Sequence, residues 1–352
     1  MKRMKVSSMT LFALILLLVM AKVIFYIAVK TQFIKINLGG GNDADYYDAF
    51  AHGYITNATS IWPIILEKLY KYNLYSREVI SYMFLLANIV FIPFLTANLA
   101  GVSFNKFQKL FLVVLLIALI YPSLYFFTFD IYRDVVMVLL FLIGSVFVKK
   151  YITNKNATSR FINFFLALLV GWCIILFRPY LGVAFLGAMF IWRIKFTKKR
   201  LIFLFVLYLL TLFTANILGL FNSLTEYREG FEGTNGSTLG LDFSNPIMFL
   251  PNFVLSILGQ MFGLFITNPF ALLVFVIETI PFLIMLKYVI KNVKLADGFV
   301  RYLLIFFVIY GSVWLIGNDN LGTAVRLRMY NYFAIYISFF YILNLKRQQG
   351  IK

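Results

Sequence analysis

Acidic side chains gather shortly after the first long apolar run of the chain. Residues 39–41 are all glycine, and Asp43, Asp45 and Asp48 follow them. Paired carboxylates beside apolar and aromatic neighbours can provide one member whose pKa suits proton abstraction. A solvated helix start, where the helix dipole favours Asp, explains the same residues. We therefore name Asp43 and Asp45 as candidate catalytic residues and keep the structural explanation open.

Arginine recurs in short turns between apolar runs, where its planar guanidinium could pair bidentately with a phosphate. The residues concerned are Arg133, Arg178, Arg326 and Arg328. The structural alternative for each is snorkelling, or an ion pair with Asp130, Asp134 or Asp319. Four arginines in three separate turns favour an anion-binding site over that alternative.

Two further residues of the acidic segment, Tyr46 and His52, join the arginines as candidate substrate-binding residues. A structural role at the membrane interface is the alternative for His52. The chain has one Cys and one His, which excludes disulfide frameworks and Cys/His zinc sites. We therefore assign no metal-ligating residues.

The composition decides which class of protein could position these groups. Of the 352 residues, 62% are hydrophobic and 13% charged, and the mean hydropathy is +0.88. Soluble domains are about 45–50% apolar and about 25% charged, so a soluble fold of this size could not bury this much apolar surface. This excludes a cytosolic enzyme, a nucleic-acid-binding domain and a disordered chain. The sequence predicts an all-α integral membrane protein.

Apolar runs of about 20 residues can cross a bilayer as helices, and cytoplasmic loops collect Lys and Arg. About ten runs qualify by this reading, some of them short: 9–29, 79–99, 110–128, 134–148, 161–177, 180–193, 201–220, 270–290, 299–317 and 329–345.

The charges orient these spans. Both termini and every second loop are rich in Lys and Arg, with Asp297 as their only carboxylate. Most of the acidic residues fall in the other loops, above all 30–78 and 221–246. We therefore expect cytoplasmic termini, and loop helices on the extracytoplasmic side. The chain 1–352 reads as a single polytopic domain without internal repeats.

The apolar segment 247–266 does not fit a simple crossing. A crossing here would move Lys287, Lys291 and Lys294 to the outer side, against the bias of all other loops. We therefore expect a re-entrant or interfacial segment near 247–266, followed by one span. Lys22 and Glu278 lie at matching depth, about 10–12 Å below their outer helix ends, so we expect them to pair.

The acidic segment resembles a known family. Asn-Asp-Ala-Asp-Tyr-Tyr at 42–47, followed by Ala-His-Gly at 51–53, is similar to the first outer loop of the GT-C superfamily of polyprenyl-phosphate-dependent membrane glycosyltransferases. The runs 121–134, 178–180 and 322–328 resemble patches of multi-pass sugar transferases and bacterial polysaccharide polymerases. The resemblance implies that Asp43 or Asp45 activates the acceptor and that the arginines hold the donor phosphate. No large soluble domain follows the last span, which favours a glycan or lipid-linked acceptor over a protein.

The resulting functional hypothesis is transfer of a sugar, with inversion, from a polyprenyl-phosphate-linked donor to a cell-surface glycan or lipid-linked acceptor. The active site would face outward from a bacterial plasma membrane. One alternative is a repeat-unit polymerase that uses polyprenyl-diphosphate-linked oligosaccharides, and another is a lipid-linked sugar transporter or flippase. Nucleic acid is not an expected partner. The residue spacing requires no cofactor, although a divalent cation, Mg²⁺ or Mn²⁺, could bridge a carboxylate and the phosphate.

Overall fold

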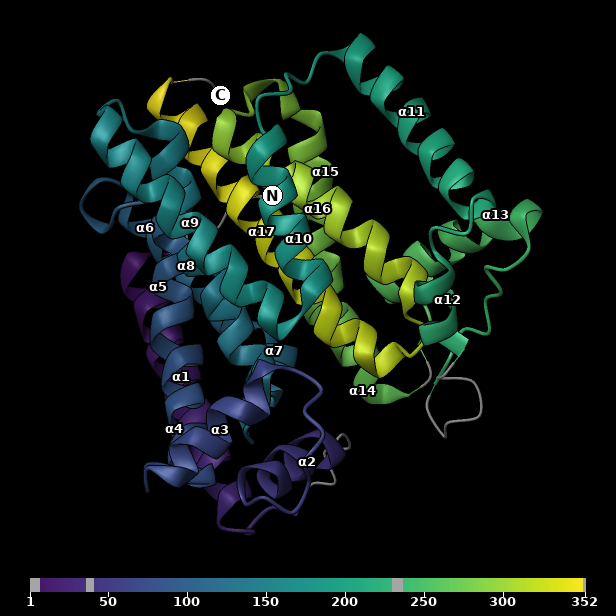
Figure 1. Ribbon diagram of the computed structural model, residues 1–352. Coiled ribbons are helices and arrows are strands. Elements are labelled where there is room, and N and C mark those ends of the chain that lie inside the picture. The colour runs from purple at the N-terminus through teal and green to yellow at the C-terminus, as the bar shows by residue number, and fades with distance from the viewer. Residues whose placement is uncertain (1–6, 36–40, 230–236, 267, 351–352) are drawn as a thin grey trace. The chain divides into compact units, whose positions relative to one another are not determined.

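The computed structural model describes residues 7–35, 41–229, 237–266 and 268–350, and the regular elements in these ranges are helices (Figure 1). One isolated antiparallel bridge joins Thr238 to Asn320. The chain divides into two compact units, Met1–Gly182 (unit 1) and Val183–Lys352 (unit 2). The all-helical expectation is confirmed for the described residues.

Unit 1 is a bundle of long helices with two short helices at one end. α6 packs against α1 and α5, and α8 packs against α5 and α9. α2 and α3 pack against each other beyond the ends of the longer helices (Figure 1). The elements are α1 (Ser8–Lys30), α2 (Gly41–Ala51), α3 (Ile61–Lys71), α4 (Arg77–Leu86), η1 (Ala87–Phe91), α5 (Ile92–Leu99), α6 (Phe104–Ile120), α7 (Pro122–Phe126), α8 (Arg133–Thr153) and α9 (Ala157–Phe177).

Unit 2 is built around its last helix. α17 packs against α15, α16 and η2, and its residues 327–338 are all buried. The elements are α10 (Pro179–Ile191, which begins at the end of unit 1), α11 (Lys198–Ile217), α12 (Asn222–Glu229), α13 (Pro246–Ser256), η2 (Ile257–Met261), α14 (Pro269–Val274), η3 (Phe275–Thr279), α15 (Ile280–Lys291), η4 (Val293–Leu295), α16 (Gly298–Gly317) and α17 (Leu321–Gln348).

Several helices begin at residues whose side chains can cap a helix N-terminus. The side chains of Ser76, Asp297 and Asn320 accept hydrogen bonds from backbone N–H groups in the first turns of α4, α16 and α17. These bonds satisfy donors that have no partner inside the helix. α6 ends before Pro122, because a proline ring disfavours the helical conformation of the preceding residue, here Tyr121.

Seven helical segments among the described residues are long and apolar enough to cross a bilayer, so the chain is a multi-pass membrane protein. They are Ser8–Lys30, Arg77–Leu99, Arg133–Thr153, Ala157–Phe177, Lys199–Ile217, Pro269–Lys291 and Gly298–Gly317. The expected count of about ten is not confirmed.

The three remaining expected spans fall short for different reasons. The run 110–128 is broken, because α6 ends at Ile120 and Pro122 begins α7. The run 180–193 lies in α10, which has 13 residues. The run 329–345 belongs to α17, which has 28 residues, but its many Tyr and Asn side chains lower the hydropathy.

Within the described ranges, three π-helical turns interrupt α-helices, and each contains a fully buried polar side chain. Asn88 lies in η1, Gln260 in η2 and Glu278 in η3. A π-turn widens the helix and redirects side chains, and such turns are frequent at functional sites. These are therefore the places where polar groups enter otherwise apolar helices.

Lys22 and Glu278 each have a partner inside their own unit. Lys22 Nζ donates to Asn88 Oδ1 at 2.8 Å and lies 4.5 Å from the centre of the Tyr125 ring. Glu278 accepts from Arg328 Nη2 at 3.4 Å. Lys22 belongs to unit 1 and Glu278 to unit 2, so the expected pair between them stays a prediction.

The segment expected to be re-entrant or interfacial forms α13 and η2, which together are shorter than the helices that can span a bilayer. Ser256 Oγ donates to the carbonyl of Leu315, and Gln260 Nε2 to that of Asn318, both at the C-terminal end of α16. Met261 O accepts from Tyr332 in the first half of α17. The segment therefore lies along one end of the α16–α17 pair.

Candidate functional site

In unit 1, a single guanidinium gathers three carboxylates. Arg77, the first residue of α4, contacts Asp45 at 2.8 Å and Asp130 at 2.7 Å through two nitrogens. Its Nη1 lies 3.8 Å from Asp48 Oδ2. The carboxylates come from α2 and from the turn before α8, so Arg77 fixes α2 against the end of the bundle. Arginine suits this role because its fork can bind several oxygens at once.

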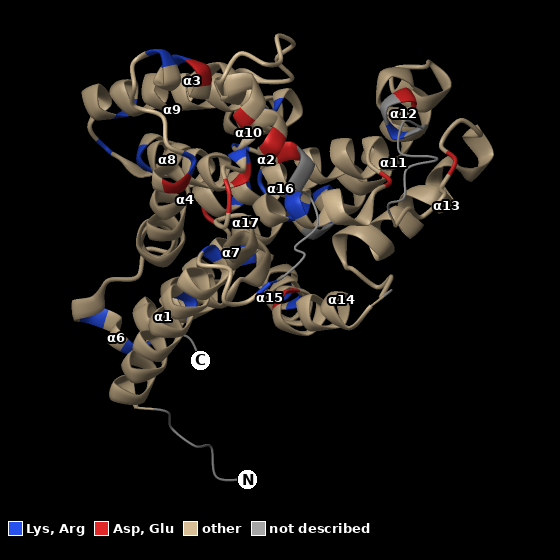
Figure 2. Cartoon of the chain, turned by 90° about the horizontal axis from the view of Figure 1, so that it is seen from below, with Lys and Arg blue, Asp and Glu red and all other residues tan. Residues whose placement is uncertain are grey.

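Of these carboxylates, Asp45 is the most open to solvent. Its side chain is 68% exposed, compared with 30% for Asp48 and 23% for Asp130. Asp43 precedes it by two residues and is half-buried in the first turn of α2. Figure 2 shows acidic residues on both α2 and α3. The two predicted catalytic residues thus lie on one short helix, and Arg77 orients Asp45.

His52 lies in a ring of tyrosines behind the carboxylates. Its Nδ1 donates to the carbonyl of Asp48 at 2.8 Å, and its ring centre lies 4.6 Å from that of Tyr70. Tyr54 and Tyr75 also face the imidazole. The Tyr75 hydroxyl donates to the Asp48 carboxylate. Burial, together with this hydrogen bond, raises the pKa of Tyr75 far above its ordinary value.

Tyr46 closes the connection between α2 and α3. Its hydroxyl donates to the carbonyl of Asn57 at 2.6 Å and accepts from the N–H of Thr59 at 3.0 Å. Trp62 Nε1 on α3 donates to the carbonyl of Ile131 at 2.8 Å. The Trp62 bond holds the α2–α3 pair against the turn that contains Asp130. The other two bonds occupy the hydroxyl of Tyr46, which was a candidate for substrate binding.

The two unit 1 arginines of the predicted phosphate site lie next to each other in the fold. Arg133 Nη1 donates to the carbonyl of Phe177 at 3.1 Å, and its Nε is buried without a hydrogen-bond partner in the described structure. Arg178, which follows Phe177, is buried and lies 3.4 Å from Asp134. Arg178 therefore forms an ion pair, which was the structural alternative to phosphate binding. Arg133 has a donor, Nε, that makes no hydrogen bond in the described structure.

Contacts connect the predicted base to these arginines within unit 1. Arg77 joins Asp45 to Asp130, and Asp130 precedes Arg133 by three residues. Arg133 in turn binds the residue before Arg178. Asp43, Tyr46 and His52 belong to the same unit. The remaining two arginines, Arg326 and Arg328, belong to unit 2.

In unit 2, Arg328 is deeply buried and Arg326 is half-buried. Arg328 pairs with Glu278 at 3.4 Å and lies 5.3 Å from the centre of the Tyr332 ring. Because the carboxylate comes from the π-turn η3, this ion pair ties α17 to the Pro269–Lys291 span. The sequence analysis offered Asp130, Asp134 or Asp319 as ion-pair partners of the arginines and did not show that Glu278 is the carboxylate within reach of Arg328.

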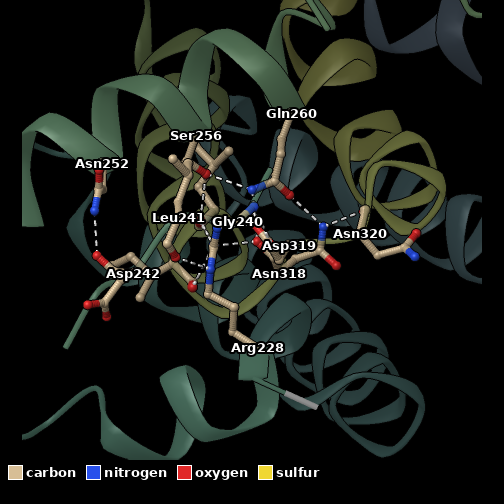
Figure 3. Close-up of polar contacts among 12 residues, drawn as sticks. Arg228, Gly240, Leu241, Asp242, Asn252, Ser256, Gln260, Asn318, Asp319 and Asn320 are labelled. Carbon is tan, nitrogen blue, oxygen red and sulfur yellow. Dashed lines mark hydrogen bonds and ion pairs between the residues drawn. The ribbon is translucent and has the colours of Figure 1, made fainter. Parts of the chain in front are cut away.

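Asp319 instead pairs with Arg228 of α12, a residue that the sequence analysis did not single out (Figure 3). The Arg228 guanidinium also donates to carbonyls of Asn318 at 2.6 Å and Ile316 at 3.2 Å, and to Leu241 O at 2.9 Å. The C-terminal carbonyls of a helix lack intrahelical partners and carry partial negative charge. Arg228 therefore caps the end of α16.

The same network fixes the loop 237–245 (Figure 3). Asp319 Oδ2 accepts from the N–H of Gly240 at 3.0 Å, and Asn252 donates to the carbonyl of Asp242. Gln260 and Asn318 exchange hydrogen bonds through their side chains and the Asn318 carbonyl. Apart from Asn318 Oδ1, which is buried without a hydrogen-bond partner among the described residues, these groups are paired, and the network holds the α16–α17 turn in place. It gives no sign of ligand chemistry.

The described residues contain no group of three His, Cys, Asp or Glu side chains arranged to hold a metal ion. In unit 1, the Arg77 guanidinium lies between the carboxylates that could otherwise gather a cation. We assign no step to a divalent cation.

No protein-family model matches the chain, and neither curated proteins nor solved structures gave a match. The helices therefore define the class of protein, a multi-pass membrane protein, and the described contacts have to carry any proposal about its chemistry.

Proposed function

We propose that this protein is a membrane glycosyltransferase of the GT-C type. It would transfer a sugar from a polyprenyl-phosphate-linked donor to a cell-surface glycan or lipid-linked acceptor at the outer leaflet. The observation that supports this most is the chain of contacts in unit 1 from the exposed Asp45, through Arg77 and Asp130, to the turn that bears Arg133. It brings a candidate base and a candidate phosphate ligand to one end of one bundle.

The charge distribution supports an outward-facing site. Within unit 1 the Asp43–Asp48 helix and Asp130 share one end of the bundle, whereas Lys106 and Lys109 of α6 and Lys149 of α8 lie toward the other. The positive-inside rule assigns the basic end to the cytoplasm. Cations also occur at the acidic end, and Arg77 among them is neutralised by the carboxylates around it.

In this proposal Asp45 accepts the proton from the acceptor hydroxyl as that oxygen attacks the sugar carbon. Arg77 holds Asp45 Oδ1, which leaves Oδ2 for the proton. Asp43 is the alternative base on the same helix. Arg133 would donate to the leaving phosphate, whose negative charge grows as the glycosidic bond breaks.

The polymerase version of this chemistry uses the same groups with a lipid-linked glycan as both donor and acceptor. The transporter hypothesis has its own support, because Asn88, Gln260 and Glu278 enter the apolar helices at π-turns. Transporters commonly place polar groups at helix breaks near the midplane.

Analysis of the surface glycan after deletion of the gene separates these functions. We expect a glycan that lacks one sugar, together with accumulation of the lipid-linked donor. Single repeat units would indicate a polymerase, and intact precursor retained on the inner leaflet would indicate a transporter. An unchanged glycan would contradict all three.

Arg133 provides the matched test of phosphate binding. Arg133→Gln should abolish product, and Arg133→Lys should restore part of it, because Lys keeps the charge but loses the planar fork. Lys71→Gln, at an exposed pair on the same end of unit 1, should leave product unchanged. Wild-type product from Arg133→Gln would remove this residue from the proposal.

A further inference from the structure

A cleft lies between α8 and α9 of unit 1, at the end opposite the carboxylates. It measures about 310 Å³ and is lined by Tyr151, Ala157, Arg160, Phe161 and Phe164. The last turns of α8 and the first turns of α9 form its walls. This cleft belongs to neither of the polar networks described above.

Arg160 carries a charge that the described structure does not neutralise. Its guanidinium lies 5.9 Å from the centre of the Tyr151 ring, and its Nε is buried without a hydrogen-bond partner. The sequence has no Asp or Glu between Asp134 and Glu226. A buried donor without a partner is energetically unfavourable, so an anion that accepts from it would be stabilised in the cleft.

The surroundings add to the positive potential. Lys149, Lys150 and Lys155 flank the connection between α8 and α9. The Lys149 ammonium donates to the carbonyls of Asn98 and Leu99. It therefore adds to the positive electrostatic potential of the cleft more than it offers a donor to a ligand. Arg160 is therefore the side chain in this cleft that is placed to bind an anion directly.

The other side of the cleft continues into an apolar surface of α9. Phe161 is 64% exposed and its ring contacts that of Phe165, and Leu169 and Trp172 continue the exposed stripe along the helix. Within a bilayer such a stripe faces acyl chains. A ligand that fits both features has an anionic head for Arg160 and a hydrocarbon chain for the stripe.

We propose that this cleft is a binding site for an anionic glycerophospholipid, with the phosphodiester on Arg160 and an acyl chain against Phe161 and Phe165. Basic pockets near cytoplasmic helix ends attract anionic headgroups in this way. The guanidinium fork matches two phosphate oxygens. The inference is independent of the proposed catalytic function, because it uses none of the same residues.

Native mass spectrometry of the full-length chain in detergent tests the site. The purified protein is titrated with phosphatidylglycerol and with phosphatidylcholine of identical acyl chains. We expect the first phosphatidylglycerol to bind about tenfold more tightly, and Arg160→Gln to remove this preference. Lys106→Gln makes the same charge change on α6, at the same end of unit 1, and should keep the preference.

A second variant separates binding from folding. Ala157→Trp fills the cleft but leaves Arg160 and the net charge intact, and it should also lose the preference. Phosphatidylglycerol binding that is unchanged in Arg160→Gln or in Ala157→Trp would overturn the proposal. So would displacement of the lipid by millimolar sodium phosphate, which would indicate a site for a free anion.

Discussion

At the scale of single residues, Arg77 does the most to organise the acidic end of unit 1. It stands at the start of a helix, where the dipole disfavours a cation, and three carboxylates offset this cost. Its removal would leave Asp45, Asp48 and Asp130 to repel one another. The residue therefore couples the position of α2 to the stability of the bundle.

Arg77→Gln should lower the free energy of unfolding by about 1–3 kcal/mol, because it breaks a multidentate ion pair that is only partly exposed. Thermal unfolding in detergent measures the loss. Adding Asp130→Asn should recover part of it, since one of the unneutralised charges is then absent. Lys71→Gln, which removes an exposed i,i+4 pair, should change little. Equal losses of unfolding free energy in Arg77→Gln and Lys71→Gln would contradict this role of Arg77.

The raised pKa of Tyr75 predicts that the stability of the folded chain depends on pH. Because its pKa is higher in the folded chain than in the unfolded one, its contribution to stability is fully present below the ordinary value of 10.0 and is lost as the pH rises above it. Tyr75→Phe should be less stable near pH 7 by about 1 kcal/mol, the net worth of the hydrogen bond to Asp48. It should also lose less stability than wild type during an alkaline titration of thermal unfolding. Tyr72→Phe, at an exposed neighbour, should follow wild type throughout.

At the scale of elements, the connection between η2 and α14 depends on a glycine. Gly263 has φ of +59°, and a Cβ there would lie 2.7 Å from Arg328 Nη1. Gly263→Ala should therefore destabilise the protein by about 1–3 kcal/mol through backbone strain and displacement of the guanidinium from Glu278. Gly187→Ala on α10, where a Cβ meets nothing within 4 Å, should be neutral or slightly stabilising. Equal unfolding temperatures for the two variants would refute this account.

Element boundaries were predictable where apolar runs and breakers coincide. The run 9–29 differs by one residue at each end from the helix Ser8–Lys30, and the run 299–317 differs by one residue at its start from Gly298–Gly317. The prediction of one span over 110–128 was wrong, because it gave the hydropathy of the run more weight than the helix-breaking Pro122. The burial of Glu278 was expected from its position within an apolar run, but the π-turns that contain Asn88 and Glu278 leave no composition signal and could not be foreseen.

At the scale of the whole molecule, the sequence predicted which types of charged residue occur near the helix ends, but not how they pair. Carboxylates after the first span and arginines at helix ends follow from the sequence. Which arginine meets which carboxylate depends on packing between distant segments, as Arg77 with Asp130 and Arg228 with Asp319 demonstrate. Arg228 was overlooked because it lies in a polar stretch that resembles an ordinary solvated loop.

The proposed orientation of the molecule makes a prediction about accessibility. In a variant that lacks Cys173, the single-cysteine substitutions Asp242→Cys and Lys109→Cys place a thiol on the loop before α13 and on α6. A membrane-impermeant maleimide should label the first in intact cells and the second only after permeabilisation. The positive-inside bias is the physical reason. The reverse pattern of labelling would invert the topology and with it the outward-facing site.

The central claim is that the carboxylates of α2 act as the base in sugar transfer, and complementation of a deletion strain tests it most directly. The measured quantity is the amount of the missing glycan product, at equal levels of membrane-inserted protein. Asp45→Asn should abolish product if Asp45 is the base, and Asp43→Asn should do so if Asp43 is. Glu67→Gln on the neighbouring α3 should restore product fully. Wild-type levels of product from both Asp43→Asn and Asp45→Asn would contradict the account.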